Sequence, residues 1–335
     1  KKNGYKIEYI VADGKENENI GGIKIIDVGY SKIRLFRPFT STLRIYRYFK
    51  ISDSNIIHFL DPGFLIYALF LKKKIVIYDV HEDVPQDIFT KHYIPFFLKH
   101  VISFITRKIE DFVSKRLSGI ITATPHLAYK FKKINPNTID INNYPSLSEF
   151  NHQPTTEKQK AVCYIGELTK VRGIKEIVQA INGTDTKLIL GGRFPDENFF
   201  QSIIKINSWK QVDFLGYLSR KDVQRVYNIS IAGLVILHPT KSFYYSLPVK
   251  MFEYMAMGLP VIATNIPLWK EIIDKYNCGI CVTYDNIEEI AEAIKKLVSL
   301  PKLAAKLGEN GKIAVHNHFN WEEEEKKLLN FYKDL

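Results

Sequence analysis

The sequence predicts an α/β protein of two domains, each built on a parallel sheet. Short β-branched, apolar runs alternate with longer helical patterns along the whole chain, and such alternation is typical of parallel sheets covered by helices on both faces. About six strand patterns fall in each half, which favours two sheets over a single barrel. A length of 335 residues gives room for two domains of ordinary size.

The individual elements follow from these patterns. In the first half we expect strands over 6–11, 23–28, 56–59, 75–79, 119–123 and 138–141, and in the second half over 161–165, 187–190, 212–215, 232–236, 261–263 and 279–282. The expected helices are 96–116, 173–181, 220–228, 249–257, 287–300 and an amphipathic 321–335. The polar stretch 146–160 is typical of a linker. We therefore predict domains over 1–150 and 151–318, followed by a C-terminal segment over 319–335.

Charge and cysteine content narrow the partners and the compartment. The net charge is +11, and residues 1–150 carry 23 Lys and Arg against 15 Asp and Glu. A basic first half favours an anionic partner, which could be a nucleic acid, a membrane surface or a phosphorylated acceptor, or else it is a lysine-rich, solvated surface. Three cysteines are too few for a disulfide framework and indicate a reducing compartment. Cys278 and Cys281 have redox-motif spacing, but no second pair lies nearby, so we interpret them as structural.

The chain shows no pattern for crossing a membrane. No apolar run reaches the roughly 20 residues that a transmembrane helix needs. The opening KKNG is typical of the end of a helix, so we expect the first strand and helix of the first domain to be missing. If the working protein also lacks them, we predict little or no activity.

A loop with glycines and cations follows the first strand of the second half. Ligands of open parallel sheets bind at the carboxyl ends of the strands, so two such sheets predict a site in the cleft between them. Gly166 would let a ligand approach the backbone, and a helix starting near Gly173 would turn its positive end toward a phosphate. Lys170 and Arg172 could add charge-assisted hydrogen bonds to a pyrophosphate. A plain tight turn would give a similar pattern.

The stretch SLPVKMFEYMAMGLP over 246–260 is more informative. It places a loop and a helix N-terminus after a strand, with Lys250 and Glu253 three residues apart on one helix face. A carboxylate that accepts from a vicinal diol, beside an ammonium near phosphates, would hold a ribose diphosphate. The alternative is an ordinary ion pair between the two side chains on the helix surface.

Two further segments carry chemistry in the first half. His81 follows a strand among acidic neighbours, which suits a sugar-hydroxyl ligand or a general acid/base. The lack of a second His at i+4 and of any D-x-D sequence disfavours metal-assisted chemistry. The segment 91–116 carries six Lys and Arg against two acids, with apolar residues at helical spacing. It is either a core-facing helix with a basic edge or a helix that contacts an anionic membrane.

These stretches together resemble glycosyltransferase family 4, a group of GT-B enzymes, in its bacterial surface-polysaccharide type. The matching segments are YDVHEDVP (78–85), YIGELTKVRGI (164–174), VDFLGYLS (212–219) and SLPVKMFEYMAMGLPVIAT (246–264), in the family's order along nearly the whole chain. The resemblance implies the GT-B fold, with two Rossmann-like domains whose parallel sheets face each other across a cleft. It also implies a C-terminal helix that packs back onto the first domain.

The resemblance also assigns roles to residues. It implies Glu253 for the ribose, His81 for the transferred sugar, and His81, Arg172 and Lys250 as the catalytic residues. The implied donor-binding residues are Gly166, Glu167, Arg172, Arg193, Tyr217, Leu218, Tyr245, Ser246, Leu247, Lys250 and Glu253. Two of them depart from the family pattern: Tyr245 stands where the first glutamate of the E-x7-E motif is usual, and Glu167 where an arginine is usual. Sugar recognition should therefore differ, and Arg193 or Lys250 should replace the missing phosphate ligand.

The prediction is a retaining glycosyltransferase without a metal or other cofactor. Its donor would be a UDP-sugar or another nucleotide diphosphate sugar, and its acceptor an oligosaccharide or a glycan linked to undecaprenyl diphosphate, at the inner face of the cell membrane. Retention and this acceptor are implied by the resemblance alone. One alternative is a UDP-sugar epimerase of the same architecture, which needs no acceptor. The other is a nucleic-acid-binding protein, which the charge allows but no recognised module supports.

Overall fold

A computed structural model describes all residues except 1–2, 30–36, 92–93 and 151–156. Parts of the predicted linker and of the segment 91–116 therefore lie outside the described residues. The chain divides into two units, residues 1–141 with 331–335 and residues 142–330. The boundary lies nearer the N-terminus than the predicted 150/151, because side chains of the second unit hold the following segment: Glu324 accepts from the Asn142 backbone, and Glu322 from that of Leu147.

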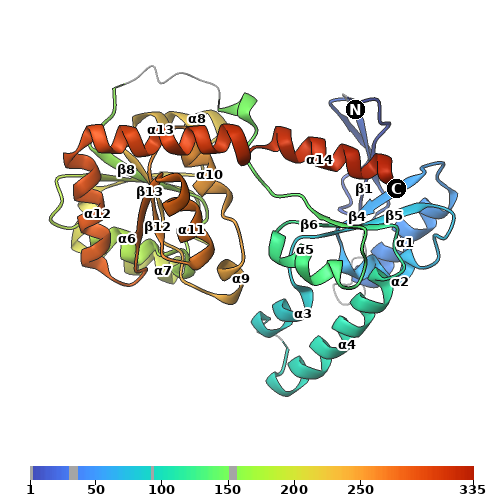
Figure 1. The fold of residues 1–335 in the computed structure, drawn as a ribbon. Helices are drawn as coiled ribbons and strands as arrows, with labels where there is room; N and C mark the ends of the chain where they lie inside the picture. Colours follow the sequence, from blue (N-terminus) through green and yellow to red (C-terminus); the bar gives the residue numbers. More distant parts are fainter. Residues whose placement is uncertain (1–2, 30–36, 92–93, 151–156) are drawn as a thin grey trace. The chain divides into compact units, whose positions relative to one another are not determined.

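The second unit is a six-stranded, fully parallel sheet covered on both faces (Figure 1). Its strands are β8 (Ala161–Ile165), β9 (Lys187–Gly191), β10 (Val212–Gly216), β11 (Ala232–Val235), β12 (Val261–Thr264) and β13 (Gly279–Val282). Its main helices are α6 (Ile174–Ala180), α7 (Glu197–Ile203), α8 (Arg220–Ile229), α9 (Lys241–Tyr244), α10 (Val249–Ala256), α11 (Pro267–Tyr276), α12 (Ile287–Ser299) and α13 (Pro301–His318). Apolar side chains alternate between two buried clusters, one under α6, α7 and α12 and one under α8, α10 and α11. All six strands were predicted, because both faces are buried and each strand is apolar throughout.

The first unit differs from the single six-stranded parallel sheet that the sequence predicted. It contains a four-stranded parallel sheet of β4 (Ile56–Phe59), β5 (Ile75–Val80), β6 (Gly119–Thr122) and β7 (Thr138–Asp140). A separate sheet holds β1 (Glu8–Val11), β3 (Ile23–Asp27) and β2 (Glu18–Ile20), and β2 runs antiparallel to β3. Two residues at positive φ, Gly21 and Gly22, close this hairpin, and a turn so short can only join antiparallel strands.

The helices of the first unit are α1 (Arg37–Ile51), α2 (Leu65–Ala68), α3 (Val84–Asp87), α4 (Phe96–Ser114) and α5 (Pro125–Lys132). Helices α1, α2 and α5 and the end of α4 pack on the core of the four-stranded sheet, whereas α3 and most of α4 extend away from it (Figure 1). The last helix of the chain, α14 (Trp321–Asp334), begins in the second unit, and its final residues from Phe331 belong to the first. Only this last turn of the predicted C-terminal segment is thus part of the first unit.

Candidate functional site

The strand order of the second unit marks where a ligand would bind. The strands lie in the order β10-β9-β8-β11-β12-β13. From β8 the chain continues to one side of the sheet through β9 and β10, and it then returns to the other side of β8 through β11, β12 and β13. In open α/β sheets the ligand site lies at the carboxyl ends of the strands at such a switch point. The predicted donor residues follow these strands: Gly166 and Arg172 come after β8, and the stretch 246–253 comes after β11.

Two glycines shape the loop that follows β8. Gly166 has a φ of +146°, and a Cβ at this position would lie 2.8 Å from the Lys250 ammonium. Gly173 has a φ of +68° and caps α6, and a Cβ there would overlap with the carbonyl oxygen of Ile236, just after β11. Only glycine fits both requirements. The loop therefore lies tightly against β11, with the ammonium directly over its backbone.

Lys250 is a partly buried cation close to a second cation. Its Nζ lies 2.7 Å from the Tyr164 hydroxyl and 3.9 Å from the centroid of that ring. Burial, and after it the positive charge of Arg172, lowers the Lys250 pKa to about 7, although Glu253 and Glu167 oppose this. A lysine with so low a pKa is not fully compensated by the two carboxylates. A diphosphate beside Gly166 would supply the missing negative charge.

Arg172 already has an acidic neighbour in this loop. Its Nε lies 3.7 Å from Glu167 Oε2. A pair at this distance, with both side chains partly exposed, is weak. The guanidinium can therefore turn to a phosphate at little cost.

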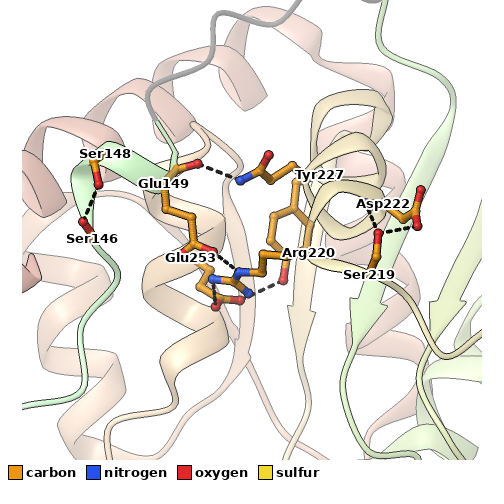
Figure 2. Close-up of polar contacts among 9 residues, drawn as sticks. Ser146, Ser148, Glu149, Ser219, Arg220, Asp222, Tyr227 and Glu253 are labelled. Atoms are coloured by element: carbon orange, nitrogen blue, oxygen red, sulfur yellow. Dashed lines mark hydrogen bonds and ion pairs between the residues drawn. The ribbon is translucent and has the colours of Figure 1, made fainter. Parts of the chain in front are cut away.

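Glu253 lies in a network that the sequence did not reveal (Figure 2). It is 8% exposed; Arg220 Nη2 donates to its Oε1 at 2.7 Å, and the Tyr227 hydroxyl donates to its Oε2 at 2.9 Å. Arg220 also binds Glu149 through Nε. The sequence left open an ion pair between Glu253 and Lys250 on the helix surface. Instead, Glu253 binds Arg220 and Tyr227, and Lys250 binds the Tyr164 hydroxyl. A carboxylate offers about four acceptor positions, so two remain for a diol.

Arg220 and Tyr227 are functional candidates that sequence reasoning missed. Both lie on α8, seven residues apart and so on one face, and Ser219 caps this helix by accepting from the Asp222 amide at 3.3 Å. This spacing was the only signal in the sequence. Nothing local links α8 to Glu253, which lies 26 residues beyond Tyr227.

The remaining predicted donor residues lie at the same edge of the sheet. Arg193 and Tyr217 follow β9 and β10, and the Arg193 guanidinium lies 4.7 Å from the ring centroid of Tyr217, which is 74% exposed. Tyr245 is exposed and packs its ring against Tyr244. The other three are held in place by packing or backbone contacts: Leu218 lies next to Gly191, Leu247 lies against the core, and the Ser246 carbonyl accepts from Trp269 Nε1 at 2.7 Å.

His81 belongs to the first unit and is held by an ionised carboxylate. Its Nε2 lies 3.4 Å from Oδ1 of Asp79, the neighbour at the end of β5. Burial disfavours the charged Asp79, but hydrogen bonds from His58 and His81 outweigh it and lower the pKa of Asp79 to about 2. The hydrogen bond to Asp79 raises the pKa of His81. The imidazole is half exposed, so a ligand can reach it.

The family described as Glycosyl transferases group 1 matches residues 147–314. This chain belongs to that family. Among curated relatives, the capsular polysaccharide biosynthesis glycosyltransferase CapM of Staphylococcus aureus is 27% identical over 192 residues, which cover 51% of this chain and 46% of CapM. The chain spans about half the length of the curated relatives it matches.

Solved structures of similar fold cover nearly all of this glycosyl transferases group 1 protein. Sucrose-phosphate synthase from Thermosynechococcus elongatus has a TM-score of 0.77 at 17% identity, covering 99% of this chain and 90% of that structure. Anabaena HepE in complex with UDP-glucose has a TM-score of 0.72 at 13% identity, covering 98% of this chain and 99% of HepE. The fold is therefore the predicted GT-B type.

Helix α4 exposes its apolar face, which rules out the core-facing interpretation of segment 91–116. The residues it buries are Ser103, Glu110, Val113 and Ser114. Its large apolar side chains lie at the surface: Phe96, Phe97, Val101, Phe104, Ile105, Ile109 and Phe112. Together with Ile66 and Leu69 near α2, several of them line an apolar groove of about 420 Å³. We call these α4 side chains the apolar face of α4.

Three smaller points concern other predictions. The described residues contain no group of three or more His, Cys, Asp and Glu side chains able to hold a metal ion, and metal independence stays a prediction. Cys278 is buried and unpaired, and burial raises its pKa to about 12, as expected of a structural cysteine. Within the described part of the chain, the helices are too short or too polar to cross a membrane.

Proposed function

We propose that this protein is a retaining glycosyltransferase that moves a sugar from a UDP-sugar to a lipid-linked or oligosaccharide acceptor in surface polysaccharide biosynthesis. The observation that carries the proposal is the position of the Lys250 ammonium. It lies over Gly166 at the switch point, and the neighbouring carboxylates do not fully compensate its positive charge. A nucleotide diphosphate supplies the remaining negative charge where such folds bind their ligands. The likeness to HepE, a structure that contains UDP-glucose, and to CapM supports the choice of donor and pathway.

The residues then take the following roles. Glu253, held by Arg220 and Tyr227, accepts hydrogen bonds from the ribose diol. Lys250 and Arg172 stabilise the diphosphate as the bond between the sugar C1 and the phosphate oxygen breaks. The acceptor oxygen bonds to C1 on the same face, and its proton passes to the departing phosphate. His81 contacts the transferred sugar, and no metal ion takes part.

Turnover and binding assays test the proposal. Release of UDP from a panel of UDP-sugars should occur with at least one donor, at a rate that EDTA leaves unchanged, and UDP should bind by calorimetry. No turnover together with no UDP binding would refute the proposal. Interconversion of free UDP-sugars without an acceptor, followed by proton NMR, would instead identify the epimerase alternative.

We also propose that the apolar face of α4 contacts an anionic membrane, which places the protein at the inner face of the cell membrane and near an undecaprenyl diphosphate-linked acceptor. Phe104 and Ile105 are 61% and 50% exposed, and such a wide apolar surface marks a contact site. The cations along the helix suit anionic headgroups: Arg116 lies over the Phe112 ring at 3.6 Å, and Lys108 over the Phe104 ring at 5.5 Å.

Vesicle binding tests this contact. The wild type should bind vesicles that contain phosphatidylglycerol, and Phe104→Ser with Ile105→Ser should weaken binding by about 100-fold or more, because each side chain contributes about 2 kcal/mol when buried. Ile313→Ser is the matched control, because Ile313 is 51% exposed on α13 of the second unit. Equal binding by the double variant and the wild type would contradict the contact. Concentration-dependent dimers lost in the double variant would identify a protein interface instead.

A further inference from the structure

A chain of side-chain hydrogen bonds leads from the C-terminal helix to His81. The Tyr332 hydroxyl, in the last turn of α14, lies 2.6 Å from His58 Nδ1. His58 Nε2 lies 2.9 Å from Asp79 Oδ2, and Oδ1 of the same carboxylate lies 3.4 Å from His81 Nε2. The members come from α14, β4 and the end of β5, and β4 and β5 are neighbouring parallel strands. All four residues lie in the first unit.

The chemistry of the four groups fixes the direction of each hydrogen bond. An ionised carboxylate can only accept, so both histidines turn an Nε2–H toward Asp79. Neutral His58 then has a lone pair on Nδ1, and the Tyr332 hydroxyl donates to it. Neutral His81 likewise has its lone pair on Nδ1, the nitrogen that Asp79 does not engage. The order of donors and acceptors is consistent along the whole chain.

We infer that Tyr332, His58 and Asp79 are positioning residues that fix the tautomer and orientation of the His81 ring, so that Nδ1 is the atom presented to the transferred sugar. The contact with the sugar rests on the proposed function, whereas the tautomer does not. An Nδ1 lone pair selects a donor sugar with a hydroxyl at the facing position. A deoxy analogue would leave this nitrogen without its partner.

The surrounding charges set the pH range in which His81 has a lone pair on Nδ1. Asp79 stays ionised, and burial raises the pKa of Tyr332 to about 12, so its hydroxyl keeps its proton. Glu82 and Asp79 both raise the pKa of His81, so Nδ1 presents a lone pair only above the His81 titration midpoint, where the ring is neutral. Tyr332 is the residue of α14 that faces these hydrogen-bonded side chains. The centroid of the Tyr5 ring lies 5.8 Å from the centroid of the Tyr332 ring.

Tyr332 is well placed to hold His58 because the last turn of α14 is packed in the first unit. Next to Tyr332, Phe331 is buried against Gly119 of β6. The hydroxyl of Tyr332 therefore reaches His58 from a turn that is packed within the first unit.

Nitrogen NMR of the histidine side chains tests the inference without any activity. In the wild type, neutral His81 should carry its proton on Nε2, with a titration midpoint above 6.5. Asp79→Asn should lower the midpoint by about one pH unit or more, because an opposite charge within hydrogen-bond distance is lost. Tyr332→Phe should shift the His58 Nδ1 resonance, because that nitrogen loses its donor, while Asp79 keeps the Nε2 proton of both rings in place. Tyr129→Phe, which removes a hydroxyl from an exposed ring on α5, is the matched control.

Kinetics separate the inference from the proposed function. Tyr332→Phe should lower kcat/KM for the UDP-sugar by about tenfold while leaving the Kd of UDP unchanged, because UDP lacks the sugar that His81 contacts. A proton on Nδ1 of wild-type His81, a His58 Nδ1 resonance unchanged in Tyr332→Phe, or a His81 titration midpoint unchanged in Asp79→Asn would each overturn the inference. If the NMR results are as expected but no UDP-sugar is turned over, the proposed function fails and the positioning chain stands.

Discussion

Replacing Lys250 with methionine should stabilise the protein and at the same time weaken donor binding. Methionine keeps the length and the apolar stem of lysine but removes the charge. In the folded protein the pKa of Lys250 falls from 10.5 to about 7, so the folded state binds this proton less tightly than the unfolded chain. The free energy of unfolding of the wild-type protein is therefore reduced below pH 7, and it recovers as the pH rises toward 10.5.

The size of the effect follows from the same pKa. A displacement from 10.5 to about 7 corresponds to about 5 kcal/mol against the charged form. Losing the hydrogen bond to Tyr164 removes about 1 kcal/mol of this gain. Partial exposure of the side chain reduces it further, so Lys250→Met should be more stable by about 2–4 kcal/mol at pH 6. Loss of the charge beside a diphosphate should cost about 3 kcal/mol, or about 100-fold in affinity.

Tryptophan fluorescence is a suitable probe of this stability. The three tryptophans, at 209, 269 and 321, all lie in the second unit with Lys250. Urea unfolding at pH 6 and pH 9, with UDP-glucose calorimetry at pH 7, measures both effects. Lys295→Met, an exposed position on α12, is the control and should change neither. A less stable Lys250→Met that binds UDP-glucose as well as the wild type does would refute the reasoning.

Three further predictions concern the same site. Arg220→Gln should raise the Kd of UDP-glucose by about tenfold, because Glu253 loses one of its two donors, whereas Arg220→Lys should restore part of the affinity; calorimetry measures both. Because the donor is expected to bind protonated Lys250, whose pKa is about 7, affinity should fall by about tenfold per pH unit from pH 7 to 9, and Lys250→Met should abolish this slope. Gly166→Ala should destabilise the second unit by about 1–2 kcal/mol in urea, because Gly166 has a positive φ. It should also weaken UDP-glucose binding, because the new Cβ meets the Lys250 ammonium. Unchanged stability and affinity would count against the tight loop.

The sequence predicted the second unit almost completely because its strands are buried on both faces. β8 and β12, for example, are apolar or small at nearly every position, and such runs have few alternatives. The first unit was harder, because β2 is exposed throughout and polar at two of its three positions. Its pairing depends on a two-glycine turn, and an alternation of strands and helices does not reveal such a turn.

For the site, the sequence predicted individual residues but not the contacts between distant segments. Residues directly after strands were correctly grouped at the carboxyl edge of the second sheet. Arg220 and Glu253 lie 33 residues apart, and Tyr332 and His58 lie 274 apart, and no local pattern reveals such pairs. For α4 the periodicity correctly showed one apolar face, but periodicity does not distinguish a face turned to the core from one turned to solvent.

The two departures from the family pattern acquire a physical meaning in the structure. Glu167 replaces the usual arginine of the loop, and its carboxylate lies beside Arg172 instead of adding a second cation there. On α10, Lys250 extends its ammonium over Gly166, and we expect it to supply the positive charge that Glu167 does not. Tyr245, at the position where the resemblance implies the first glutamate, is exposed and carries a phenol in place of a carboxylate. Because a phenol binds sugar hydroxyls differently from a carboxylate, selection of the sugar should depend more on the His81 Nδ1 lone pair, and the general family pattern is a poor guide to which sugar is transferred.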